Sequence, residues 1–203
     1  MNLADYFDQY KCDKGNIKHQ YNRVYEPALD PLRNSPIRLL EIGVFKGASL
    51  QAWADYLPLA TFVGVDIFER VDIPKIPILN HPRVSWVKCS STGELPVELF
   101  ELVGDGFDII IDDGLHTHDG QRLTFENFIP FLKPGGKYFI EDVWPFDLMD
   151  AREKQHQWLV RHPKDFSDEQ YTKLLKATHP HKITFHDLRQ GFGPDTFIIE
   201  VTT

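Results

Sequence analysis

The sequence predicts one α/β domain built on a doubly wound, mostly parallel sheet, preceded by a short helical cap. Three observations support this fold. Short apolar runs alternate with helical patterns along most of the chain. Two of these runs end in pairs of acids, and a third ends in a glycine-containing turn. The last two runs are separated by turn-forming residues, which predicts a terminal hairpin with an antiparallel last strand.

The bulk properties exclude several classes of protein. A chain of 203 residues is expected to form one domain with a sizeable core. The net charge of −8 argues against a broad electrostatic contact with nucleic acid or an anionic membrane. Two cysteines, Cys12 and Cys89, provide neither a disulfide framework nor a zinc site. No signal peptide or long apolar run is visible, so we expect a cytoplasmic protein.

The first 35 residues are predicted to form the cap. Apolar side chains recur at helical spacing in residues 3–10 and again in residues 21–28. The intervening stretch begins with Cys12–Gly15, which has the composition of a turn. We expect residues 36–203 to form the domain that contains the sheet, and residues 1–35 to cover the ligand-binding edge of that sheet.

The first strand and the turn after it resemble a nucleotide-binding hairpin. Arg38–Ile42 reads as a buried strand, Gly43–Gly47 as the turn, and a helix opens at Ala48. Glycines let the backbone approach a ligand, and the free N–H groups of the helix start point towards it. The G-x-x-x-G spacing differs from the G-x-G-x-x-G of dinucleotide-binding enzymes, which disfavours a nicotinamide dehydrogenase. Taken alone, the pattern also fits a plain turn.

The next two strands continue the same arrangement. Thr61–Val65 is a second strand, and Asp66 closes it in the position from which an acid accepts hydrogen bonds from a ribose diol. Ile67 and Phe68 are placed to cover an adenine face. Val84–Lys88 reads as a third strand, and Glu94–Val103 as the helix that follows it.

The residues that predict a cation site lie in an acidic strand–helix–strand unit. Phe107–Ile111 and Lys137–Ile140 read as neighbouring parallel strands, with a helix and the turn Lys133–Gly136 between them. Each strand ends in two acids, and the carboxyl ends of parallel strands meet at one edge of the sheet. Crowded carboxylates resist ionising unless a cation neutralises them, and oxygen ligands suit Mg²⁺. The alternative is that they are solvated turn residues.

The C-terminal part is predicted to complete the sheet. Residues 146–160 and a segment that starts at Ser167 and ends before Pro180 read as helices. Lys182–Leu188 and Thr196–Val201 alternate like strands, and the turn between them predicts a hairpin. Trp144 either lines an acceptor pocket or belongs to the core.

The order of these motifs resembles class I S-adenosylmethionine-dependent methyltransferases. LLEIGVFKGAS is similar to their first motif and VGVDIF to their second, and the likeness extends over residues 36–203. The resemblance implies a Rossmann-like sheet of seven strands with an antiparallel last strand, and S-adenosylmethionine as cofactor. Phe45 stands where the usual motif has its middle glycine. The cofactor-binding residues implied are Glu41, Gly43, Val44, Gly47, Asp66, Ile67, Ser90 and Asp112.

A finer resemblance is to macrolide and rhamnosyl sugar O-methyltransferases. Their D-D-G-x-H segment is followed 28 residues later by E-D, an interval that Asp113 and Glu141 reproduce. The resemblance implies Asp113, Glu141 and Asp142 as metal ligands and His116 as the catalytic base, with His118 as the rival base. An N-terminal pattern is also similar and implies residues that face cofactor or substrate: Asp13, Lys14, Gly15, His19, Tyr21, Tyr25 and Glu26.

The function implied is S-adenosylmethionine-dependent O-methylation, assisted by Mg²⁺ or another divalent cation. The substrate expected is a diol-bearing small molecule, a sugar or a glycosylated metabolite, with no nucleic acid or membrane partner. The sequence leaves open whether the protein forms a homo-oligomer. Two alternatives remain: a cephalosporin hydroxylase-like enzyme with an iron site from His116, His118 and Asp113, and a non-catalytic cofactor-binding module.

Overall fold

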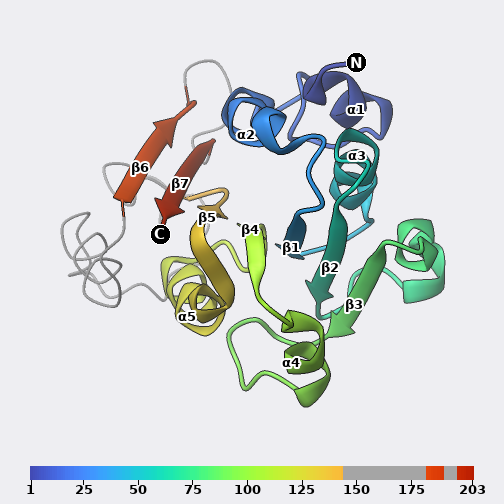
Figure 1. Cartoon of the computed structure of the whole chain (residues 1–203), viewed down its shortest axis with the longest axis vertical. Helices are drawn as coiled ribbons and strands as arrows, with labels where there is room; N and C mark the ends of the chain where they lie inside the picture. Colours follow the sequence, from blue (N-terminus) through green and yellow to red (C-terminus); the bar gives the residue numbers. More distant parts are fainter. Residues whose placement is uncertain (144–181, 190–195) are drawn as a thin grey trace.

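The structure is a computed structural model of the chain, and it describes residues 1–143, 182–189 and 196–203. In this part of the chain, seven strands form one sheet in the order β3-β2-β1-β4-β5-β7-β6 (Figure 1). Their bounds are β1 Arg38–Ile42, β2 Thr61–Asp66, β3 Val84–Lys88, β4 Phe107–Asp112, β5 Leu132–Ile140, β6 Lys182–Asp187 and β7 Phe197–Thr202. β1 to β5 pair in parallel, and β7 runs antiparallel to both β5 and β6. The predicted fold class, including the antiparallel last strand, is confirmed.

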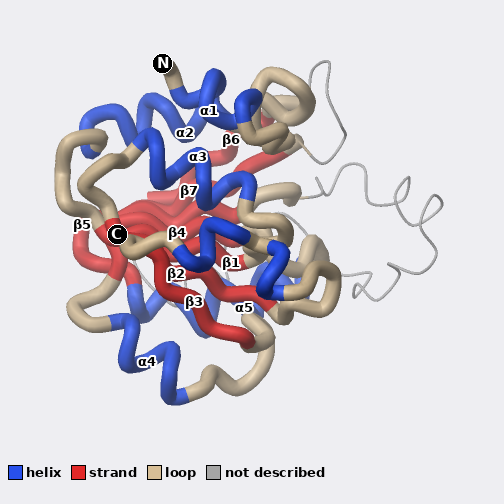
Figure 2. The backbone as a smooth tube through the Cα atoms, turned by 90° about the vertical axis from the view of Figure 1, so that its right-hand side faces the viewer, coloured by secondary structure: helices blue, strands red, loops and turns tan. Residues whose placement is uncertain are grey.

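Helices cover both faces of this sheet, so the sheet is doubly wound. The helices of the described residues are α1 Leu3–Gln9, α2 Asn22–Leu29, α3 Ala48–Tyr56, α4 Val97–Val103 and α5 His118–Phe128. Figure 2 shows α1, α2 and α3 on one face, with α4 and α5 on the other. Within the described ranges, no helix combines the length and the apolar character needed to cross a bilayer.

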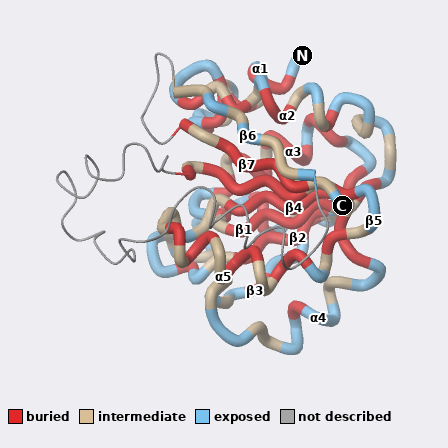
Figure 3. Tube along the Cα trace, turned by 90° about the vertical axis from the view of Figure 1, so that its left-hand side faces the viewer, coloured by how far each residue is buried: buried red, intermediate tan, exposed pale blue. Residues whose placement is uncertain are grey.

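The two faces form two separate apolar layers. Leu39 and Ile109 point to the layer that contains Trp53 of α3. Leu40 points to the opposite layer, which contains Phe125 of α5. The central strands are therefore buried on both sides, as Figure 3 shows. This burial explains why their sequences are continuous apolar runs and do not alternate with polar residues.

Two elements begin at least three residues away from where the sequence predicts. β5 starts at Leu132, five residues before the predicted Lys137, because Leu132 pairs with Phe107 before the register shifts. α4 starts at Val97 because Pro96 holds extended backbone at the N-cap. The predicted helices at 146–160 and after Ser167, together with Trp144 and residues 190–195, lie outside the described residues.

Residues 1–35 pack directly on α3. The rings of Phe7 and Tyr25 meet Trp53 edge to face, with centroids 4.8 and 5.1 Å away. Tyr25 also contacts Phe139 of β5 with a centroid distance of 5.0 Å. The N-terminal segment thus shares the core of the sheet, and these contacts hold it over the carboxyl ends of β4 and β5. Its division from the remaining domain at residue 35 stays a prediction.

Candidate active site

β4 and β5 bring the two acidic pairs to one edge of the sheet. The strands are adjacent and parallel, and Asp112 pairs with Ile140. The backbone N–H of Glu141 donates to the carbonyl of Asp112 at 2.9 Å. Asp113 therefore follows β4 at the level where Glu141 and Asp142 follow β5. The predicted adjacency of the two strands is confirmed.

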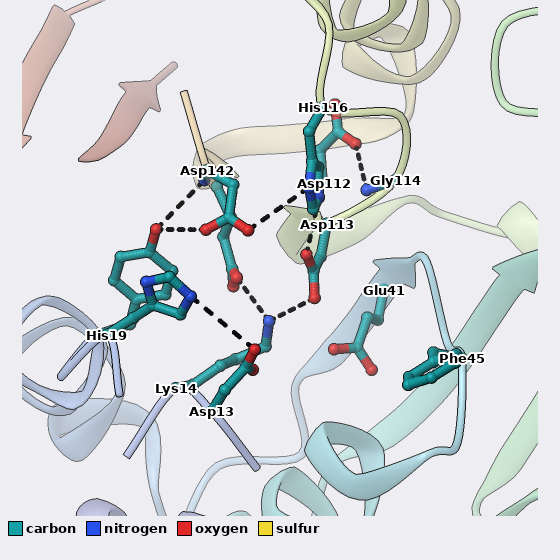
Figure 4. A network of polar contacts seen from close by, with 12 residues as sticks. Asp13, Lys14, His19, Glu41, Phe45, Asp112, Asp113, Gly114, His116 and Asp142 are labelled. Carbon is teal, nitrogen blue, oxygen red and sulfur yellow. Dashed lines mark hydrogen bonds and ion pairs between the residues drawn. The ribbon is translucent and has the colours of Figure 1, made fainter. Parts of the chain in front are cut away.

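His116 lies between two of these carboxylates. Its Nε2 is 3.0 Å from Oδ1 of Asp113, and its Nδ1 is 3.4 Å from Oδ2 of Asp142 (Figure 4). Burial lowers the pKa of His116, but the hydrogen bond with Asp113 and the charges of both acids outweigh it and raise the pKa to about 9. With both acids ionised, the imidazole is therefore cationic at neutral pH.

The acids and the histidine together fit a divalent cation. Asp113, His116 and Asp142 each offer one ligand atom, and these atoms lie within 4.8 Å of one another. A carboxylate-rich set of this kind suits a hard cation. The carboxylate of Glu141 is next to this group in the chain but contacts other side chains in this structure.

Those side chains come from the N-terminal segment. Lys14 Nζ lies 2.5 Å from Oδ2 of Asp113 and 2.5 Å from Oε2 of Glu141. The hydroxyl of Tyr25 donates to Oε1 of Glu141 at 2.5 Å. The hydroxyl of Tyr21 donates to Oδ1 of Asp142 at 2.5 Å. The N-terminal pattern identified these residues only as facing the site. Their pairing with individual acids comes from the structure.

His19 and Asp13 lie beside this network, and His19 is close enough to Asp142 to act on the pKa of that carboxyl. His19 Nδ1 is 2.9 Å from Oγ1 of Thr196, which precedes β7. Its ring stacks on Tyr21 with a centroid distance of 5.1 Å, and its Nε2 is 3.8 Å from Asp13. This stacking holds Tyr21 over the end of β5.

The crowded acids differ in the direction in which their pKa values are shifted. Burial would raise the pKa of Asp113, but Lys14 and His116 hold it below its usual range. Burial raises the pKa of Glu141 and of Asp142 above their usual values. Burial also raises the pKa of Asp112 to about 7. Carboxylates this close share protons as a group, and a bound cation would favour their ionised forms.

The glycine turn after β1 approaches this cluster closely. Gly43 has φ +91°, and a Cβ there would lie 2.0 Å from the carbonyl oxygen of Asp113. Gly47 has φ +76° and caps the start of α3. Phe45, at the position of the missing middle glycine, also has a positive φ of 49°. The turn keeps a glycine-like backbone despite the substitution, and the buried Val44 anchors it.

Glu41 and Asp66 flank this turn. Glu41 is fully buried; its Oε1 accepts from Trp53 Nε1 at 3.4 Å, and its Oε2 has no hydrogen-bond partner among the described residues. Burial raises the pKa of Glu41 to about 7. Asp66 accepts from the N–H groups of Phe45 and Phe68 at 2.8 and 2.6 Å, which ties the end of β2 to the turn.

The remaining predicted cofactor residues surround the same edge. Ile67 is 44% exposed next to Asp66, and Ser90 is exposed after β3. Asp112 is buried at the end of β4 and accepts from the N–H of Gly114 at 3.2 Å. The structure thus places all eight residues along the carboxyl ends of β1 to β4, where open parallel sheets bind ligands.

His118 is the rival base. It is buried as the first residue of α5, and the cluster of ligand atoms in the described part of the chain contains His116 without it. A neighbour on the same helix, Gln121, donates to the backbone carbonyl of Glu141 at 2.9 Å. The start of α5 therefore supports the turn after β5.

Comparison with known proteins gives a family and several relatives. A family described as methyltransferase domain matches residues 40–143. A tetracenomycin-C rhamnosyl 3'-O-methyltransferase from Streptomyces olivaceus is 30% identical over 67% of this chain and 35% of its own length. L-olivosyl-oleandolide 3-O-methyltransferase from Streptomyces antibioticus is 33% identical over 68% and 37%. The chain thus spans about a third of the length of these curated relatives.

Solved structures show the same fold. The MycE methyltransferase from the mycinamycin biosynthetic pathway, in complex with Mg, SAH and mycinamycin VI, superposes with a TM-score of 0.71. It is 23% identical, and the match covers 99% of this chain and 54% of that one. Fibrillarin from Aeropyrum pernix has a TM-score of 0.60 at 17% identity. The family match extends over just over half of the chain and contains the glycine turn and both acidic pairs, so this chain belongs to the class I methyltransferase-domain family.

Proposed function

We propose that this chain is an S-adenosylmethionine-dependent O-methyltransferase that uses Mg²⁺ or another divalent cation. Its acceptor is a hydroxyl of a diol-bearing small molecule, a sugar or a glycosylated metabolite. The observation that carries the proposal is the group formed by Asp113, His116 and Asp142, which lies against the glycine turn at Gly43. A base and a cation site beside a nucleotide-binding turn suit methyl transfer to oxygen.

The chain's own residues would bind the cofactor at the carboxyl ends of β1 to β4. Oε2 of Glu41, which has no described partner, is an acceptor for a buried donor such as the cofactor's ammonium group. Asp66 lies where its carboxylate can accept from a ribose diol. S-adenosylmethionine would supply the methyl group, which passes from its sulfonium sulfur to the acceptor oxygen.

Asp113, Glu141 and Asp142 would hold the cation. Bound there, a divalent cation would lower the pKa of the acceptor hydroxyl and fix its orientation. His116 would take the hydroxyl proton on a ring nitrogen. Ionised Asp113 and Asp142 are what raise the pKa of His116 to about 9. Because a cation offsets their charge, it would return the imidazole towards the neutral form that a base needs.

The names of the relatives support a sugar hydroxyl as acceptor. The relatives from Streptomyces olivaceus and Streptomyces antibioticus are named for a rhamnosyl and an L-olivosyl group. Mycinamicin VI 2''-O-methyltransferase from Micromonospora griseorubida and demethylmacrocin O-methyltransferase from Streptomyces fradiae are further O-methyltransferases among them. Because this chain matches only 35–37% of the length of these relatives, the acceptor remains a proposal for this protein. Vicinal hydroxyls are a suitable ligand pair for an oxygen-preferring cation.

Calorimetric titration tests the proposal in two steps. We expect S-adenosylhomocysteine to bind the wild type, and Mg²⁺ to bind that complex. Asp113→Asn should abolish the Mg²⁺ signal, whereas Asp119→Asn, the same charge change at a half-buried position of α5 outside the cluster, should leave it unchanged. Cofactor binding without a cation site would keep the family and reject the mechanism.

Replacement of the base gives an independent test. His116→Gln should lower turnover of a diol-bearing sugar about a hundredfold or more, while its affinity for S-adenosylhomocysteine stays near wild type. Loss of cofactor affinity instead would contradict the assignment of His116 as base. Turnover that needs Fe²⁺ and O₂, without methyl transfer, would favour the hydroxylase-like alternative.

A further inference from the structure

Lys14 is a rigidly placed lysine in the loop between α1 and α2. Gly15, its neighbour, packs so tightly on α1 that a Cβ there would lie 2.3 Å from Oδ1 of Asp8. That carboxylate also accepts from the N–H of Asn16 at 2.9 Å. On the other side, the carbonyl of Lys14 accepts from the N–H of Asn22 at 3.1 Å. The loop therefore directs the side chain inwards, where only 2% of it is exposed.

The ammonium group of Lys14 bridges two strands. It lies 2.5 Å from Asp113, which follows β4, and 2.5 Å from Glu141, which follows β5. Figure 4 shows the side chain reaching from the N-terminal segment towards Asp113. A buried ammonium group needs such partners, and the two carboxylates need a positive charge. Lys14 is thus the counter-ion of this acidic pair.

The rest of the N-terminal segment binds two of the three acids predicted to hold the cation. Tyr25 donates to the second oxygen of Glu141, and Tyr21 donates to Asp142. Each carboxylate predicted to hold the cation therefore has a donor from residues 14–25. This segment and a divalent cation would therefore bind the oxygen atoms of the same carboxylates.

We propose that Lys14 is a built-in competitor of the divalent cation. The inference rests on the proposed function, because it takes Asp113 and Glu141 as cation ligands. A cation that binds these oxygens has to move the ammonium group away from them, since two positive charges a few ångströms apart repel each other. Lys14 thereby weakens cation binding, and cation binding releases the Lys14 side chain from the acids.

Substitution of Lys14 measures this competition directly. Lys14→Gln and Lys14→Met remove the charge, and Lys18→Gln is the matched control. Lys18 lies four residues further along the same loop, with an exposed side chain 3.3 Å from Asp13. Mg²⁺ is titrated calorimetrically into each protein after treatment with EDTA and saturation with S-adenosylhomocysteine. We expect the two Lys14 variants to bind Mg²⁺ at least about tenfold more tightly than wild type, and Lys18→Gln to match wild type.

A second measurement uses the wild type alone and does not depend on variants that fold. Lysines are acetylated in EDTA and at rising Mg²⁺, and the product is digested and analysed by mass spectrometry. We expect Lys14 to be protected in EDTA and to react faster as Mg²⁺ binds, with Lys18 as the internal reference whose rate stays constant.

The outcomes separate this proposal from the proposed function. Unchanged or weaker Mg²⁺ affinity in both Lys14 variants, or Lys14 labelling that does not respond to Mg²⁺, would overturn the competition. Absence of Mg²⁺ binding in wild type and variants alike would overturn it together with the cation-assisted mechanism. Tighter binding in the variants without methyl transfer to any hydroxyl would keep the competition and reject the proposed function.

Discussion

The approach of Gly43 to Asp113 gives a prediction about how the two halves of the site are held together. A Cβ at residue 43 would lie 2.0 Å from the carbonyl oxygen of Asp113 and 2.6 Å from its carbonyl carbon. Both are backbone atoms, so they cannot rotate away as a side chain would. In Gly43→Ala, the turn after β1 therefore has to move away from the end of β4.

The size of the effect follows from these distances. Ordinary contact begins at 3.4 Å, so the two backbones have to separate by about 1.4 Å. The positive φ of 91° costs an alanine roughly 1–2 kcal/mol, and the overpacking adds about 1–3 kcal/mol. A displacement of about 1 Å can reduce catalysis a hundredfold. We expect Gly43→Ala to lose about 2–5 kcal/mol of unfolding free energy and to weaken S-adenosylhomocysteine binding strongly.

Gly135→Ala provides the matched control. Gly135 has a similar φ of +79°, but a Cβ there meets no atom within 4 Å. This variant should lose only the backbone contribution, roughly 1–2 kcal/mol, and keep the affinity for S-adenosylhomocysteine. Urea denaturation and calorimetry measure the two quantities. Equal losses of stability in both variants, with unchanged cofactor affinity in Gly43→Ala, would refute the reasoning.

Two further predictions concern buried carboxylates. The hydrogen bond with His186, together with Lys137, lowers the pKa of Glu200 from 4.5 to about 2. Because the folded pKa is the lower one, ionised Glu200 stabilises the fold above about pH 4.5, and this contribution is lost as the pH falls towards 2. Urea denaturation of Glu200→Gln should show a deficit of roughly 1–2 kcal/mol at pH 7 that shrinks below pH 4.5; a deficit independent of pH would argue against this linkage. Tyr25→Phe removes the donor to Oε1 of Glu141 and should cost about 1–3 kcal/mol, whereas Tyr6→Phe, which removes the same atom from a half-buried ring, should cost less. Equal losses in the two tyrosine variants would contradict the role given to Tyr25.

The acids at the strand ends are a part of the site that the sequence alone predicts correctly. Asp66, Asp112 and Glu141 each follow or close an apolar run, and a strand–helix–strand crossover almost always returns the chain in parallel on the same sheet. The sequence alone therefore predicts that the carboxyl ends of these strands share one edge of the sheet, and this prediction needs no information about packing. The position of β5 was less well predicted, because its first residue, Leu132, pairs through an irregular register that no local pattern reveals.

The conformation of the turn at Phe45 is predicted only in part by the sequence. The sequence shows that a glycine is missing from the turn, but it does not show how the backbone responds. The structure keeps a positive φ at Phe45 and secures it with the hydrogen bond from its N–H to Asp66. A contact between residues 21 positions apart thus stabilises a conformation that the side chain alone disfavours.

The sequence by itself determined the class of sheet, the glycine turn and the positions of the acids, because each depends on the period and the ends of local segments. Only the tertiary structure decided which positive charge meets which acid. Lys14 is 99 residues from Asp113 and 127 from Glu141 in the chain, so nothing local relates them. The packing of residues 1–35 on α3 brings them together, and the burial that results makes the ammonium group and the two carboxylates depend on one another.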